Sequence, residues 1–281
     1  MENNVNDLLD GILKENADQR STDWFNERAA RATSSIMYKL LPNDSSASGS
    51  KAFKDEHFGF GKGAVTIIKE KAMEKYLEKA IKDDLDNVWN VNFGKNWEGA
   101  ASGMTMMMKG VKEMQTSPPF MKWDKYPHLA GGSPDFLSNV LGVGEIKCTA
   151  DEGKQLARWR DVVSLTDMKN CEDKVISGAY WQLHSNALFT GMDVVTFVSF
   201  CPLGFAGYTD DREYLDFSVG YAFENTPANV REMYCHIITE EVNKDEFEVI
   251  EDIVVRYEKL LNREYEKLLD RGRKEIKFSI S

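Results

Sequence analysis

The chain of 281 residues is 42% hydrophobic and carries a formal net charge of −11. This size and composition suit one large packed domain and exclude wholesale disorder. No apolar run approaches the roughly 20 residues that span a bilayer, and the N-terminus lacks the pattern of a signal peptide. We therefore expect a cytoplasmic protein without a membrane partner. Its acidic balance suits a nucleic-acid partner only if positive charge is concentrated in one groove.

The N-terminal region is predicted to be mainly helical. Apolar spacing favours a helix over 5–15, and good N-cap residues at 21–23 predict a second helix. A third helix is expected over 34–41. The serine-rich residues 42–51 form a polar loop, which is either a surface connection or a mobile flap.

Two longer helices are expected next. Residues 64–82 have the pattern of a charged amphipathic helix. Lysine–glutamate pairs three residues apart can form on its exposed side: Lys71 with Glu74 and Lys75 with Glu78. A further helix is predicted to begin at Gly94 and to run through the methionines at 104–108, which are typical of core filler.

From residue 119 onward, Pro and Gly divide the chain into short segments, which indicates β-strands. A strand over 141–148 places Glu145 and Lys147 on one face, because side chains alternate along a strand. The remaining elements are expected as helices near 151–163, 174–190 and 244–271, and strands over 193–201 and 234–239. We expect an α/β (α+β) fold with a mixed central sheet flanked by helices, an N-terminal helical region and a long C-terminal helix.

Two carboxylates and one ammonium group stand at the edge of the predicted strand pair. Asp135 follows Gly-Ser-Pro, and Glu145-Ile146-Lys147 begins ten residues later. A divalent cation such as Mg²⁺ prefers oxygen ligands, which Asp135, Glu145 and the carbonyl of Ile146 can supply. Such an ion activates water against a phosphodiester, and Lys147 can hold that water or stabilise the charged phosphate. Alone, the pattern is weakly specific, since a turn residue and a solvated strand face would look the same.

The segments 133–135 and 144–148 resemble the PD-(D/E)xK nuclease superfamily, and more narrowly the lambda-exonuclease (YqaJ-type) viral recombination nucleases. The resemblance covers roughly residues 19–270, with a longer stretch between Ser35 and Gly94 than compact members have. It implies a restriction-endonuclease-like core in a single nuclease domain. Its parts would be 1–115 with a phosphate pocket, 116–240 as the catalytic sheet, and 241–281 as the terminal helix and tail.

Two N-terminal segments carry the same resemblance. Residues 19–35 match the family's N-terminal motif, which implies that Arg28 and Ser35, with Trp24 beside them, form a pocket for a 5′-terminal phosphate. A guanidinium does present a planar fork to phosphate oxygens. Residues 93–100 match a Gly-x-x-x-Glu helix start, which makes Glu98 a candidate metal ligand or a residue beside the ligands. The earlier stretch 61–63 with Glu70 or Glu74 competes for this match, but fewer of its neighbours agree. Otherwise these are a surface Arg, an N-cap Ser and a Glu favoured by the helix dipole.

A later helix completes the predicted catalytic set. Residues 180–184 resemble the family's helix after the core, which implies that Gln182 binds near the attacking water or the scissile phosphate. The alternative is a helix Gln bonded to backbone. His184 points elsewhere around the helix and is expected to be structural. Three basic residues after the active-site strand either contact the DNA backbone or form a solvated helix face: Lys154, Arg158 and Arg160.

The resemblance implies a two-metal Mg²⁺- or Mn²⁺-dependent exonuclease that degrades one strand of double-stranded DNA from its 5′ end. It would leave 3′ single-stranded overhangs for phage-type homologous recombination. It also implies a trimeric ring around DNA ends and a single-strand annealing protein as partner, in a host cytoplasm if the protein is viral. A PD-(D/E)xK endonuclease and a catalytically inactive DNA-binding scaffold stay open as alternatives.

Overall fold

The structure, a computed structural model, describes residues 21–41, 49–81, 89–208 and 217–280. Its N-terminal elements are α2 (Thr22–Arg28), β1 (Ala32–Thr33), α3 (Ser34–Leu40), α4 (Lys51–Glu56), α5 (Lys62–Leu77) and α6 (Trp89–Lys109). The strands β2 (Gln115–Thr116), β3 (Met121–Lys122), β4 (Ala130–Gly132), β5 (Phe136–Ser138) and β6 (Gly142–Cys148) follow. Next come α7 (Glu152–Asp161), α8 (Leu165–Asn170), α9 (Lys174–Thr190), β7 (Val194–Phe200), η2 (Pro202–Gly204), α10 (Val219–Asn225), α11 (Ala228–Tyr234), β8 (Cys235–Glu241) and α12 (Asp245–Ile280).

The strands form two sheets that together carry the candidate site. The larger has the order β2-β5-β6-β7-β8, in which β6 and β7 are parallel and the other neighbours antiparallel. The smaller has the order β1-β4-β3, with β1 parallel to β4 through the pairs Ala32–Ala130 and Thr33–Gly131. Since β4 leads directly into β5, the smaller sheet joins the N-terminal region to the edge of the larger one.

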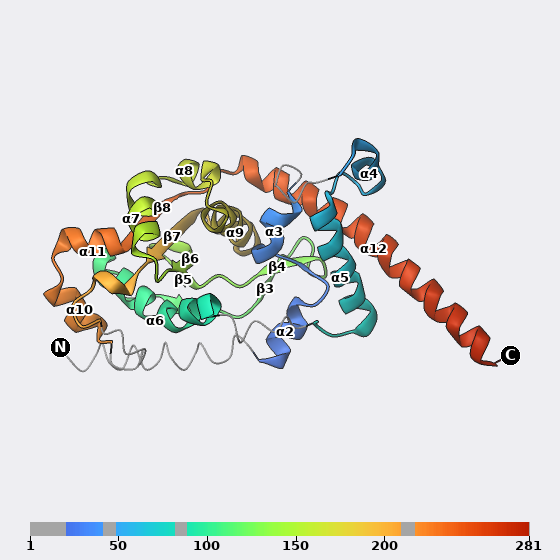
Figure 1. Cartoon of the computed structure of the whole chain (residues 1–281), viewed down its shortest axis with the longest axis horizontal. Coiled ribbons are helices and arrows are strands. Elements are labelled where there is room, and N and C mark those ends of the chain that lie inside the picture. The colour runs from blue at the N-terminus through green and yellow to red at the C-terminus, as the bar shows by residue number, and fades with distance from the viewer. Residues whose placement is uncertain (1–20, 42–48, 82–88, 209–216, 281) are drawn as a thin grey trace.

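Helices cover both faces of the larger sheet (Figure 1). On one face α9 packs against β6 and β7 through apolar residues that include Val143 and Leu183. On the other face α6 packs against Ile146 and Phe200. Because side chains alternate along β6, Glu145 and Lys147 share the α9 side with Val143. The sheet is thus a mixed sheet between helical layers, as predicted.

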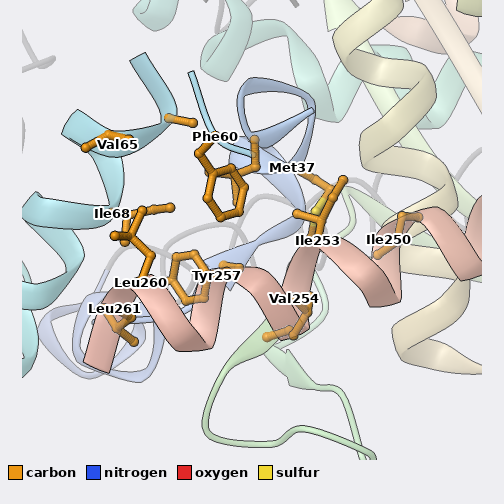
Figure 2. Packing of buried hydrophobic residues seen from close by; sticks show 14 of the residues in the cluster. Met37, Phe60, Val65, Ile68, Ile250, Ile253, Val254, Tyr257, Leu260 and Leu261 are labelled. Atoms are coloured by element: carbon orange, nitrogen blue, oxygen red, sulfur yellow. The ribbon is translucent and has the colours of Figure 1, made fainter. Parts of the chain in front are cut away.

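A third apolar cluster joins α12, α5 and α3 (Figure 2). α12 presents a stripe of buried residues at helical spacing, including Ile250, Val254, Tyr257 and Leu261. They meet Ile68 of α5 and other apolar residues of the N-terminal region. Beyond this cluster α12 extends away from the body of the molecule (Figure 1). None of the described helices combines the length and the apolarity needed to cross a bilayer.

Most predicted elements are present, with shifted ends. The predicted helices at 21–23, 34–41 and 174–190 are α2, α3 and α9, and the strands around 141–148, 193–201 and 234–239 are β6, β7 and β8. α5 begins two residues earlier and ends five residues earlier than predicted, because Glu78 adopts a left-handed conformation there. α6 begins at Trp89 rather than Gly94. The helix predicted over 5–15 and residues 42–48 of the predicted loop lie outside the described residues.

Four predictions need correction. Lys51 starts α4, capped by the Ser50 side chain, and does not belong to a loop. α4 itself, α8, α10 and α11 lie where no helix is predicted. The Lys71–Glu74 pair forms, with 2.8 Å between Nζ and Oε2, but Glu74 is buried and not on an exposed side. Lys75 donates to the Asn262 side chain of α12 and thereby joins two helices.

Candidate active site

Asp135 and Glu145 are brought together by the β5–β6 hairpin. Asp135 lies one residue before β5, and its backbone N–H donates to the carbonyl of Gly144 at 3.0 Å. Its carboxylate returns to the same strand, since Oδ2 accepts from the backbone N–H of Ile146 at 2.6 Å. Ile146 is the residue between Glu145 and Lys147, so the Asp135 carboxylate is anchored beside both.

Glu145 is a buried carboxylate with one oxygen paired and one oxygen unpartnered. The residue is 1% exposed. Its Oε1 accepts from Lys147 Nζ, whereas Oε2 is buried without a hydrogen-bond partner. Burial, followed by repulsion from Asp135, raises the pKa of Glu145, although Lys147 acts in the opposite direction. An unpaired buried carboxylate oxygen is costly and therefore marks a place where a cation can bind.

Lys147 stays charged in this surrounding. Burial acts to lower the pKa of its ammonium group, but attraction by Glu145 and Asp135 is stronger and raises the pKa overall. Its side chain is 27% exposed. The ammonium group of Lys147 therefore stays positively charged. It pairs with Glu145, and part of its side chain is exposed to solvent.

Glu98 approaches the same pair from α6. It is half-buried, and its charge contributes to raising the pKa of Glu145, Lys147 and Cys148. The charges of Asp135 and Glu98 thus both act on Glu145, whose unpartnered oxygen fits a hard cation such as Mg²⁺. In the described part of the chain, no group of three or more His, Cys, Asp or Glu side chains lies close enough to form a metal site by itself.

Arg28, Ser35 and Trp24, for which the resemblance implies a phosphate pocket, lie together in a second cluster. The Arg28 guanidinium donates through Nη2 to Ser35 Oγ at 3.1 Å and lies over the Trp24 ring at 4.1 Å. A fourth residue completes the cluster. Ser133 Oγ accepts from Arg28 Nη1 at 3.3 Å and from Trp24 Nε1 at 3.2 Å.

Ser133 was not assigned a role from the sequence, although it belongs to the Gly-Ser-Pro-Asp segment. Its position connects the pocket to the carboxylates, because it lies two residues before Asp135. Arg28 is also within electrostatic reach of Glu145. Burial lowers the pKa of Arg28 to about 10, against the attraction of Glu145 and Glu74. The guanidinium therefore stays charged at neutral pH, and the pocket and the carboxylates form one polar site.

Gln182 lies on α9 and is half-buried. Asn186 lies one turn later on the same helix face. Its side chain packs directly against β4, because a Cβ atom built on Gly132 would lie only 1.9 Å from Asn186 Oδ1. Gln182 therefore belongs to the face of α9 that is directed toward β4. His184 is structural, as expected, since it is buried, bonds the Tyr180 carbonyl at 2.8 Å and accepts from the Asn243 N–H at 3.3 Å.

The three basic residues after β6 do not form one surface. Arg158 is buried and donates to Asp173 at 3.0 Å and to Ser199 at 3.4 Å. Arg158 thereby connects α7 to the N-terminus of α9 and to β7. It is neither on a solvated helix face nor placed to contact DNA. Arg160 is exposed and paired with Asp161 at 2.6 Å, and Lys154 lies 3.8 Å from Asp151.

Comparison with known proteins shows likeness in structure. No protein-family model matches the sequence, and no curated protein matches it. The solved structure of an alkaline exonuclease from Laribacter hongkongensis has a TM-score of 0.61 at 16% identity, over 90% of this chain and 99% of that chain. The complex of that enzyme with dAMP gives the same values.

A phage-related exonuclease from Haemophilus somnus 129PT has a TM-score of 0.56 at 14% identity, over 85% of this chain and 96% of that chain. Each match extends over nearly the whole length of the solved chain, so the likeness concerns the complete architecture. The predicted α+β fold is confirmed, and it is shared with these two solved exonuclease structures.

Proposed function

We propose that this protein is a metal-dependent exonuclease that degrades one strand of double-stranded DNA from its 5′ end and leaves a 3′ overhang. One observation carries the proposal. A half-buried arginine with two serine hydroxyls and an indole is joined, through Ser133, to a carboxylate–lysine pair whose carboxylate is buried. An anion pocket beside a hydrolytic site suits a substrate with a terminal phosphate next to the bond that is cut.

The carboxylates provide the hydrolytic half of the site. Asp135, Glu145 and Glu98 would hold Mg²⁺ or Mn²⁺, and the carbonyl of Ile146 stays a predicted ligand. When bound, the metal supplies Lewis-acid activation of water and neutralisation of charge on the phosphate. Lys147, whose ammonium group pairs with Glu145 and is partly exposed, would stabilise the charged phosphate electrostatically. Gln182, from the α9 side, would orient the water or the scissile phosphate.

The pocket provides the end-recognition half. Arg28 can exchange its hydrogen bonds to Ser35 and Ser133 for bonds to phosphate oxygens, because a guanidinium has five donors. The two serine hydroxyls are then released to donate to the same phosphate. The Trp24 ring lies against one face of the guanidinium, 4.1 Å from its central carbon. A 5′-hydroxyl end would leave this half-buried charge without a phosphate partner.

The test is digestion of 3′-labelled linear duplexes that carry a 5′-phosphate or a 5′-hydroxyl, with Mg²⁺ or with chelator. We expect metal-dependent nucleotide release from the 5′ end, faster with the phosphate. Arg28→Ala should reduce kcat/KM on phosphorylated ends about 10- to 100-fold, since a hydrogen bond to a charged group contributes roughly 1.5–3 kcal/mol. Its effect on hydroxyl ends should be much smaller.

Two other outcomes would replace the proposal. Equal cleavage of linear and circular DNA, with equal loss in Arg28→Ala, would identify an endonuclease. DNA binding without any metal-dependent cleavage would identify a scaffold. The trimeric ring, the annealing partner and the role in recombination stay predictions from the resemblance. The mass of the protein in solution tests the first of these directly.

A further inference from the structure

The turn between α2 and β1 has an unusual backbone. Ala30 has φ +58°, in the left-handed region that residues with a Cβ rarely adopt. This residue lies two positions after Arg28 and five before Ser35. The direction in which the chain leaves α2 therefore determines how the guanidinium and the Ser35 hydroxyl face each other.

Two buried side chains from distant helices hold Ala30 by both of its backbone groups. The carboxylate Oε2 of Glu74, on α5, accepts from the Ala30 N–H at 2.8 Å. The hydroxyl of Tyr257, on α12, donates to the Ala30 carbonyl at 2.9 Å. Tyr257 is 0% exposed and Glu74 4% exposed. Figure 2 shows Tyr257 on α12 beside Leu260, within the cluster that joins α12 to α5.

Both carboxylate oxygens of Glu74 accept further hydrogen bonds or share them with Ala30. Lys71 Nζ donates to the same oxygen as Ala30, at 2.8 Å, and the backbone N–H of Ile81 donates to Oε1 at 3.2 Å. Its charge also reaches Arg28, whose protonated form it favours. A buried carboxylate with three donors is a rigid anchor, and here one of those donors belongs to the turn that follows the pocket arginine.

We propose that Glu74 and Tyr257 are positioning residues that hold Arg28 and Ser35 in register for a 5′-terminal phosphate. This inference rests on the proposed exonuclease function. The two residues would not contact DNA. They act through the backbone of Ala30, so that the packing of α5 against α12 sets the selectivity of the enzyme for phosphorylated ends.

The experiment compares Tyr257→Phe and Glu74→Gln with matched variants of the same helical layer. Tyr257→Phe removes one hydroxyl and leaves the ring in place. In Glu74→Gln the amide nitrogen must face either Ala30 and Lys71 or Ile81, so one set of donors loses its acceptor. The controls are Tyr265→Phe and Glu264→Gln, since Tyr265 is half-buried and Glu264 is a buried carboxylate paired with Lys267. Thermal melting establishes that each variant is folded.

Two readouts separate positioning from folding. The first is KM and kcat on 5′-phosphate and 5′-hydroxyl duplexes. The second, independent of catalysis, is fluorescence anisotropy of the same duplexes in chelator. We expect both test variants to raise KM and Kd for phosphorylated ends roughly three- to tenfold, the range for one lost hydrogen bond. kcat and all values for hydroxyl ends should stay within about twofold, and the controls should keep the wild-type preference.

The outcomes are distinguishable. If wild-type protein prefers phosphorylated ends and Arg28→Ala abolishes the preference, but Tyr257→Phe and Glu74→Gln retain it, the positioning role is wrong and the function stands. Equal losses on both kinds of end also overturn it. If wild-type protein shows no end-dependent release at all, the proposed function fails. Should Glu74→Gln not fold, Tyr257→Phe decides the matter alone.

Discussion

The substitution Lys147→Met tests whether the carboxylate–lysine pair is as buried as the structure shows. Methionine keeps most of the stem of the side chain and removes only the ammonium group. Glu145, 1% exposed, then loses the partner of Oε1 while Oε2 already has none. Removing one partner of a buried pair costs roughly 3–5 kcal/mol. Because the Lys147 side chain is 27% exposed, we expect a smaller loss, about 2–3 kcal/mol near pH 8.

The loss should depend on pH in a defined direction. The pKa of Glu145 is already raised by burial and by Asp135, and without Lys147 it rises further. A carboxyl group whose folded pKa lies above its unfolded value of about 4.3 binds more protons when folded. The stability of the Lys147→Met variant should therefore be close to that of wild type near pH 4.5. It should fall as the pH rises toward the pKa of Glu145 in the folded state.

Chemical denaturation in chelator at pH 5 and pH 8 measures this dependence. We expect Glu145→Gln combined with Lys147→Met to recover most of the stability that Lys147→Met loses at pH 8, because no charge is then buried. A Lys147→Met variant with the same stability as wild type at both pH values would refute the buried pair. An equal loss at both values would show that packing, not charge, is responsible.

Three further predictions test the fold, and two of them include a control substitution. Gly144→Ala should lower the free energy of unfolding by about 1–3 kcal/mol, because the new Cβ would lie 2.1 Å from the buried Phe136 ring. The control is Gly94→Ala, where nothing lies within 4 Å of the new Cβ. It should be neutral or stabilising by up to about 1 kcal/mol. Arg158→Met should lower the melting temperature without changing DNA affinity in chelator. Arg160→Met, at an exposed position, should change neither. Weaker DNA binding by Arg158→Met would support the predicted DNA contact of Arg158. Burial lowers the pKa of His184, so stability should fall as the pH drops below about 6.5; an unchanged acid slope in His184→Gln would show that another group is responsible.

The elements with strong local signals could be predicted from the sequence. α2 begins after the Ser21 cap, and α9 runs from its Asp173 cap to Gly191 in a left-handed conformation. β6 and β7 have apolar runs typical of buried strands. α8, α10 and α11 were missed because helices of six or seven residues contain barely two turns of periodic pattern.

Long-range contacts explain the remaining errors. The spacing of Lys71 and Glu74 fits a surface pair, and only the presence of Ala30 and α12 shows that Glu74 is buried. Arg158 has the charge of a surface residue, but Asp173 and Ser199 come from two other elements. The pairing of two-residue β1 with β4 joins positions 32 and 130 and has no local signature. Ser133 lay inside the recognised motif, yet its role depends on Arg28 and Trp24 from α2.

The bond between Tyr257 and Ala30 spans 227 positions of the chain. During synthesis on a ribosome, Trp24, Arg28 and Ser35 are therefore made early, and the hydroxyl that bonds the Ala30 turn between them is made much later. Closing so long a loop carries an entropic cost that local structure cannot offset in advance. In the proposed exonuclease, the β5–β6 hairpin with Asp135, Glu145 and Lys147 is thus synthesised well before the α12 hydroxyl that would hold the turn after Arg28.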